Sequence, residues 1–233
     1  MGLSNEHNGS IELKDEPVVG SKFTDYLSNH NPSAVDPIIE IAITPNRPDA
    51  LGVRGIARDL AARGIGVLKP AHTPTISAMQ KNTIKIKIND DVLENGCPVF
   101  YSCMIRGVKN RPSPKWLRDR IESIGLRSIS SLVDITNFFT MDRGRPLHVF
   151  DSDKIEGSLR ISFAEGNESI DALDEKNYNL PKDSMIISDA SGIISIAGIM
   201  GGVSTSCSEN TINILLESAY WDPITIAKAG RSL

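Results

Sequence analysis

The stretch INILLESAYW, residues 212–221, sets a single carboxylate inside an apolar run. Four apolar residues precede Glu217, and Tyr220 and Trp221 follow it closely. The run predicts a buried strand. A buried carboxylate costs free energy unless another group pairs with it. The group that Glu217 faces is therefore the central question that the sequence raises.

Composition places the chain among soluble globular proteins. Of its 233 residues, 40% are hydrophobic and 23% are charged, as is usual for such proteins. No apolar run approaches the roughly 20 residues that span a bilayer, and the first residues carry no secretory signal pattern. Three cysteines without a C-x-x-C pair and four scattered histidines predict neither a disulfide framework nor a zinc site. We expect a cytoplasmic protein with no membrane partner.

The first third of the chain contains few regular elements. Residues 1–36 are polar and turn-rich and predict an arm or a partial domain. The alternating stretch 38–44 predicts a strand, and a helix follows it, with Asp49 as N-cap and Gly64 as C-terminal stop. Two prolines within residues 65–82 indicate a linker.

Helices and strands alternate in the remainder. The stretch 113–125 predicts a helix capped by Ser113, the stretch 130–144 predicts a second, and Asp222 caps a third. The inner stripe of the first helix comprises Trp116, Leu117, Ile121 and Ile124. Apolar runs bounded by turn residues predict strands over 83–90, 99–108, 159–164, 184–189, 192–198 and 211–220.

Three motifs suit either a ligand site or ordinary structure. AGIMGG, residues 197–202, places glycines between two strands, where they form a ligand-binding wall or a tight turn. His148 stands between apolar neighbours, as a core histidine or a functional one. Asn137 lies in mid-helix and needs polar partners if it is buried. Neither a nucleotide-binding glycine motif nor a G-x-S-x-G motif occurs, whereas a paired-carboxylate site stays open.

The net charge of −4 conceals a contrast between two regions. Residues 104–145 hold nine Lys or Arg against four Asp or Glu, whereas residues 146–222 hold four against thirteen. The basic region is typical of a surface that contacts a phosphate backbone, or of a solvated helix face.

Several motifs, in this order along the chain, resemble the β subunit of bacterial phenylalanyl-tRNA synthetase. They are ITPNRPDALGVRGIARDLAA, RGVKNRPSPKWLRDRIESIGLRSISSLVDITNFFT, GRPLHVFD, AGIMGG and ILLESA. The resemblance implies an α+β chain in two parts. Residues 1–82 would be part of a small helical domain plus a linker. Residues 83–233 would be a mixed α/β editing domain with sandwich-like sheets, truncated at its C-terminal end.

The resemblance also implies an activity and a site. The family's editing site hydrolyses tyrosine that has been attached by mistake to phenylalanine tRNA. Its substrate-binding residues fall on Asn137, His148, Gly198, Gly201 and Glu217. Glu217, ionised, would accept a hydrogen bond from the tyrosine hydroxyl, and His148 would make a second one. No residue is assigned as the general base, because the ester needs only a positioned water.

Partners and cofactors follow from the same resemblance. The full enzyme is a ligase that uses ATP and magnesium, and it joins two α and two β subunits around phenylalanine tRNA. This chain would need no cofactor and would not aminoacylate alone. One alternative is a non-catalytic tRNA-binding or scaffolding fragment. Another is a free-standing editing protein, against which the TPNRPDALGVRG segment argues because its resemblance is to the full subunit. The tRNA-binding candidates are Lys109, Arg111, Lys115 and Arg118.

Overall fold

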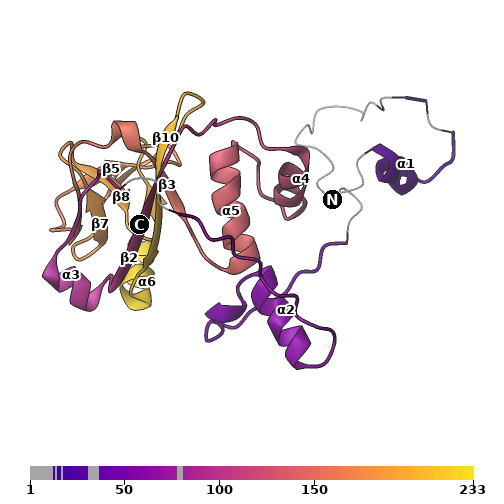
Figure 1. Ribbon diagram of the computed structural model, residues 1–233, viewed down its shortest axis with the longest axis horizontal. Coiled ribbons are helices and arrows are strands. Elements are labelled where there is room, and N and C mark those ends of the chain that lie inside the picture. The colour runs from indigo at the N-terminus through magenta and orange to yellow at the C-terminus, as the bar shows by residue number, and fades with distance from the viewer. Residues whose placement is uncertain (1–12, 14, 17, 31–36, 78–80) are drawn as a thin grey trace.

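Strand β10 (Asn213–Tyr220) is the centre of a three-stranded antiparallel sheet in the computed structural model of the chain (Figure 1). It pairs along its length with β2 (Val99–Arg106), and residues 214–217 also pair with β3 (His148–Asp151). Neighbouring strands on both sides suit the apolar character of this stretch. The structure describes residues 13, 15, 16, 18–30, 37–77 and 81–233.

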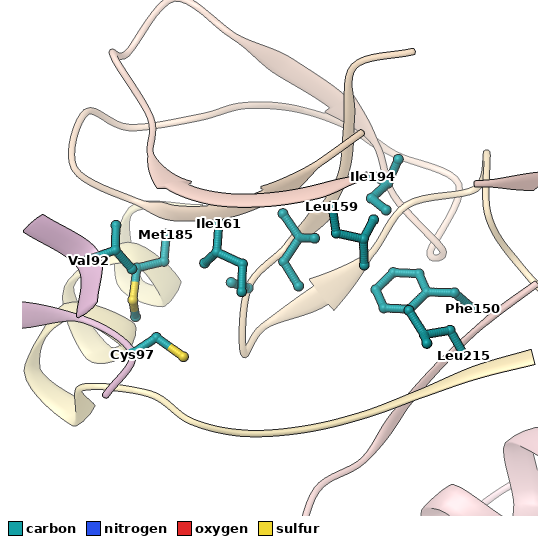
Figure 2. Packing of buried hydrophobic residues seen from close by; sticks show 10 residues of the cluster. Val92, Cys97, Phe150, Leu159, Ile161, Met185, Ile194 and Leu215 are labelled. Carbon is teal, nitrogen blue, oxygen red and sulfur yellow. The ribbon is translucent and has the colours of Figure 1, made fainter. Parts of the chain in front are cut away.

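A second sheet of five strands packs against the first. Its order is β1-β4-β7-β8-β9, with β1 parallel to β4 and the other neighbours antiparallel. The strands are β1 (Ile86–Ile88), β4 (Leu159–Phe163), β7 (Met185–Ser188), β8 (Ile193–Ile196) and β9 (Met200–Gly201). Phe150 and Leu215 of the first sheet meet Leu159, Ile161 and Ile194 of the second in one buried cluster (Figure 2). This core confirms the predicted α+β class and gives the sheets a sandwich-like arrangement.

Two helices stand on the outer face of the three-stranded sheet. Leu132 of α5 (Ser131–Arg143) packs with Val149 and Ile214, and α4 (Lys115–Ser123) packs against α5 (Figure 1). The even-numbered residues of β10 therefore face the helices. Since side chains alternate along a strand, the odd-numbered residues face the second sheet.

Smaller elements close the ends of the sandwich. They are α3 (Asp90–Asn95), the 3-10 turn η3 (Ser152–Lys154), the hairpin of β5 (Ser169–Asp171) and β6 (Asn177–Asn179), and α6 (Pro223–Ser232). The predicted cap of the last helix is confirmed, because the Asp222 carboxylate accepts from the Thr225 N–H at 2.7 Å.

The N-terminal part holds α1 (Phe23–His30), which buries no residue, the 3-10 turn η2 (Pro48–Ala50) and α2 (Val53–Ala62). Gly52 lies directly on the backbone of Gly144, so a Cβ at position 52 would come within 2.5 Å of the Gly144 nitrogen. This contact joins the start of α2 to the end of α5. The prediction for residues 1–36 lies largely outside the described residues.

The expected strand over residues 38–44 is wrong. The stretch forms no strand, and Ile38, Ile39 and Ile41 are exposed. An apolar alternation alone cannot make a strand without a neighbour that accepts its hydrogen bonds. Similarly, the strand expected over 83–90 shortens to β1, where β4 supplies the pairing.

Two expected helix caps are also wrong. Asp49 lies in η2, and its carboxylate pairs with Arg47 and Arg58 instead of capping α2, which follows Gly52. Ser113 donates to the buried carboxylate of Asp134 rather than to a helix end. In both cases a nearby charged group competes for the capping side chain.

The remaining predicted helix features are largely confirmed. Gly64, Gly125 and Gly144 follow their helices with positive φ. Leu117 and Ile121 are buried as expected, whereas Trp116 and Ile124 are exposed. The strands over 99–108, 159–164, 184–189, 192–198 and 211–220 appear within two residues of the expected bounds.

Candidate functional site

Glu217 faces the interior of the sandwich. It pairs in register with Ser102 on β2 and with His148 on β3, so three polar residues form one row across the sheet. The residue is only 6% exposed. Among the described residues, no hydrogen bond or ion pair reaches its carboxylate. Such an unsatisfied buried acid is unusual in a core and is typical of a ligand site.

Burial changes the ionisation of Glu217. The loss of solvation raises the pKa of its carboxyl from 4.5 to about 7. The ionised Glu217 that the resemblance implies for the tyrosine complex stays a prediction. Near neutral pH both forms are populated, and a ligand that donates a hydrogen bond draws the group toward the ionised form.

His148 lies beside Glu217 and is held by two contacts. Its ring stands edge-on to Phe150, with centroids 4.4 Å apart. On the other side lies Gly201 of β9, and a Cβ there would come within 2.9 Å of the His148 Nε2 atom. Burial lowers the pKa of the imidazole from 6.5 to about 4. His148 is therefore neutral near pH 7, with one ring nitrogen as donor and one as acceptor.

The glycine motif brings the two sheets into close approach. Gly198 has φ +71°, and a Cβ there would come within 2.7 Å of Trp221 and of Ile226. Gly201 contacts His148 as described. The motif is therefore more than a turn, because both glycines permit contacts that any side chain would block.

Asn137 is half-buried on α5. Because α5 covers the even-numbered face of β10, it lies on the opposite side of the sheet from the Glu217 side chain. No hydrogen bond among the described residues joins its amide to Glu217 or His148. The structure thus brings Glu217, His148 and Gly201 together, places Gly198 nearby through Trp221, and leaves Asn137 apart.

Leu173 was not predicted as a site residue. It follows β5, and its N–H donates to the Gly201 carbonyl at 3.0 Å. Its side chain lies against Gly201, and the residue is 45% exposed. The hairpin therefore covers the glycine that supports His148. No sequence signal marked Leu173, because it stands in a polar turn far from both strands in the chain.

The basic candidates lie close together in the sequence, at the start of α4. Lys109, Arg111, Lys115 and Arg118 are all exposed and lie on or just before α4. Lys115 pairs with Asp119, so part of its charge is already compensated. The other three make no ion pair with a described residue, which leaves them available to an anionic partner.

Neither a metal cluster nor a membrane helix occurs in the part of the chain that the structure describes. No three His, Cys, Asp or Glu side chains there are grouped to hold a metal ion. No described helix is long and apolar enough to cross a membrane.

Comparison with known proteins identifies the family to which the two-sheet domain belongs. A sequence model of the B3/4 domain matches residues 96–233, more than half of the chain, and the chain belongs to this family.

The chain is 56% identical over its whole length to the phenylalanine–tRNA ligase β subunit of Ruegeria pomeroyi and covers 29% of it. The β subunits of Cereibacter sphaeroides and Mesorhizobium japonicum are 53% and 51% identical over 99% and 100% of the chain, which covers 28% of each. An N-terminal fragment of the phenylalanyl-tRNA synthetase β subunit from Pyrococcus horikoshii has a TM-score of 0.49 at 14% identity, over 88% of this chain and 68% of that one. The resemblance predicted from the motifs is confirmed, and the chain spans less than a third of these curated relatives.

Proposed function

We propose that this chain is the editing module of a phenylalanine–tRNA ligase β subunit, and that it hydrolyses the ester of tyrosine on phenylalanine tRNA. The observation that carries the proposal is the row of buried Glu217 and half-buried His148 on the inner face of the sheet, without hydrogen-bond partners among the described residues. A phenolic hydroxyl supplies the missing donor to Glu217 and can make a second hydrogen bond with neutral His148.

The arrangement accounts for selectivity against phenylalanine. An apolar pocket rejects an added hydroxyl only about 100-fold. A pocket built around a hydroxyl rejects the analogue that lacks it by roughly 10⁴, because its polar groups stay unpaired. In the proposed site phenylalanine would leave both Glu217 and His148 without a hydrogen-bond partner.

The chemistry needs little more than positioning. An aminoacyl ester is an activated acyl group, and water attacks its carbonyl carbon to release tyrosine and the free tRNA. Backbone groups around Gly198 and Gly201 are candidates to hold the terminal ribose or the developing oxyanion. Asn137 would hold the amino-acid backbone only if it reached the site from α5. The α subunit, ATP and magnesium would act in aminoacylation, outside this chain.

The test is hydrolysis of tyrosyl-tRNA by the chain and by the intact enzyme. Replacing Glu217 with Ala removes a hydrogen bond to a charged group, worth about 1.5 to 3 kcal/mol, so hydrolysis should fall roughly 10- to 150-fold. His148→Ala should cost less, and Glu94→Ala on the exposed surface of α3 should change nothing. Aminoacylation by the intact enzyme should be unaffected. Undiminished hydrolysis by Glu217→Ala would contradict the proposal, and inactivity of the unaltered chain and enzyme would favour the scaffolding alternative.

A further inference from the structure

The row that contains Glu217 has a third polar member. Ser102 of β2 stands directly opposite Glu217, on the side away from His148. Residues paired in register share a face of the sheet, with Cβ atoms about 4.5 to 5.5 Å apart. Ser102 is half-buried, so its side chain lies at the edge of the site, on the same face of the sheet as Glu217.

A neighbouring amide fixes the role of that hydroxyl. The Asn82 Oδ1 atom accepts from the Ile84 N–H at 3.0 Å, which turns the amide nitrogen toward Ser102. The Asn82 Nδ2 atom then donates to the Ser102 Oγ atom at 3.2 Å. A serine that accepts in this way keeps its own O–H as a donor. Among the described residues this O–H has no acceptor.

Across the sheet, the acceptor that Ser102 faces in register is Glu217. The titratable groups near the carboxylate are His148, which is neutral near pH 7, and the buried thiol of Cys97, which donates to the Val99 carbonyl. Arg106 lies farther along β2 and donates to Thr83. The facing strands β4 and β7 present apolar side chains.

We infer that Ser102, oriented by Asn82, is a positioning residue that donates to the Glu217 carboxylate and holds it as the acceptor for a phenolic hydroxyl. The hydrogen bond forms when Glu217 is ionised, which is the state that a donor ligand selects. The consequence for tyrosine rests on the proposed function. The coupling between Ser102 and Glu217 does not, because it is a property of the chain alone.

The test is a ¹³C NMR titration of the Glu217 carboxyl in the full chain, with its signal assigned by its loss in Glu217→Gln. Ser102→Ala removes a donor to the ionised form and should raise the titration midpoint by about one pH unit. Ser102→Thr keeps the hydroxyl and should restore the midpoint. Ser218→Ala is the matched control, because Ser218 adjoins Glu217 on β10 but faces the other side of the sheet.

A second variant and a second readout make the result decisive. Asn82→Ala alters an exposed residue, so it tests the inference even if Ser102→Ala fails to fold. It should raise the titration midpoint of Glu217, by less than Ser102→Ala does. In each variant the pH profile of tyrosyl-tRNA hydrolysis should shift by the same amount as the titration midpoint of Glu217. An unchanged midpoint in Asn82→Ala and Ser102→Ala, or an equal shift in Ser218→Ala, would overturn the inference. A chain that shows these shifts but hydrolyses no tyrosyl-tRNA would overturn the proposed function instead.

Discussion

Replacing Glu217 with Gln should stabilise the fold at neutral and alkaline pH. The carboxyl titrates at 4.5 when exposed and at about 7 in the folded chain. Below pH 4.5 it is protonated in both states and costs nothing. As the pH rises from 4.5 to 7, unfolding releases a proton that the folded state retains, so stability is lost progressively. Gln copies the protonated acid in size and charge and does not titrate.

The magnitude follows from the shift in pKa. One pKa unit corresponds to 1.36 kcal/mol, so the shift of Glu217 amounts to about 3 kcal/mol above pH 7. In a chain of this size the melting temperature should rise by roughly 6 to 12 °C. At pH 4 the difference between variant and parent should vanish.

Urea unfolding from pH 4 to 8 measures this difference directly. The His148 imidazole, whose pKa burial lowers to about 4, removes stability as the pH falls from 6.5 to 4. That effect is common to both proteins and cancels in their difference. Glu94→Gln on α3 should give a difference near zero throughout, because the side chain is exposed. If the Glu217→Gln variant were less stable than the parent at pH 8, the folded chain would stabilise the ionised carboxylate by more than its burial costs, and a net unfavourable burial of Glu217 would be refuted.

Three further outcomes are expected. Gly201→Ala should reduce hydrolysis of tyrosyl-tRNA about 100-fold, because the new Cβ displaces the His148 ring; an unchanged rate would show that the ring position is unimportant. The chain alone should give only background ATP–pyrophosphate exchange with phenylalanine, since its sequence has no ATP-binding motif; exchange in a pure preparation would refute this. In the intact enzyme, the slope of log K for tRNA against log[salt] should fall by about 0.7 to 0.9 for each phosphate that the variant no longer neutralises, and an unchanged slope would leave these residues as a solvated face. The residues to be replaced together by Ala are Lys109, Arg111, Lys115 and Arg118.

Local patterns predicted the second half of the fold better than the first. Strands such as β10 and helices such as α5 carry both a hydrophobic pattern and an end signal, and the two agree with the packing. The stretch 38–44 carries the pattern alone and forms no strand. Sequence periodicity reports which side chains prefer burial, but it does not supply the neighbouring strand that would bury them.

The site was predictable only in part, for a related reason. Glu217 was conspicuous as a single charge in an apolar run, and the glycines were conspicuous by their number. Ser102 and Leu173 are ordinary residues by themselves. Their positions depend on strand register and on a hairpin that folds over Gly201, and neither can be read from local spacing.

The polar row also explains why stability and recognition are opposed in β10. Leu215 packs into the core from the same face that carries Glu217, so the strand must be buried for the sandwich to form. That burial withdraws water from the carboxylate and from His148, which raises one pKa and lowers the other. Both shifts favour the neutral form of the side chain. Burying a neutral polar group without a hydrogen-bond partner costs less free energy than burying a charged one. Under the proposed function a ligand hydroxyl would relieve the remaining cost, and the free energy gained in this way would favour a ligand that carries a hydroxyl. A core of apolar residues at these two positions would be more stable, and under the proposed function it would lose the groups that distinguish tyrosine from phenylalanine.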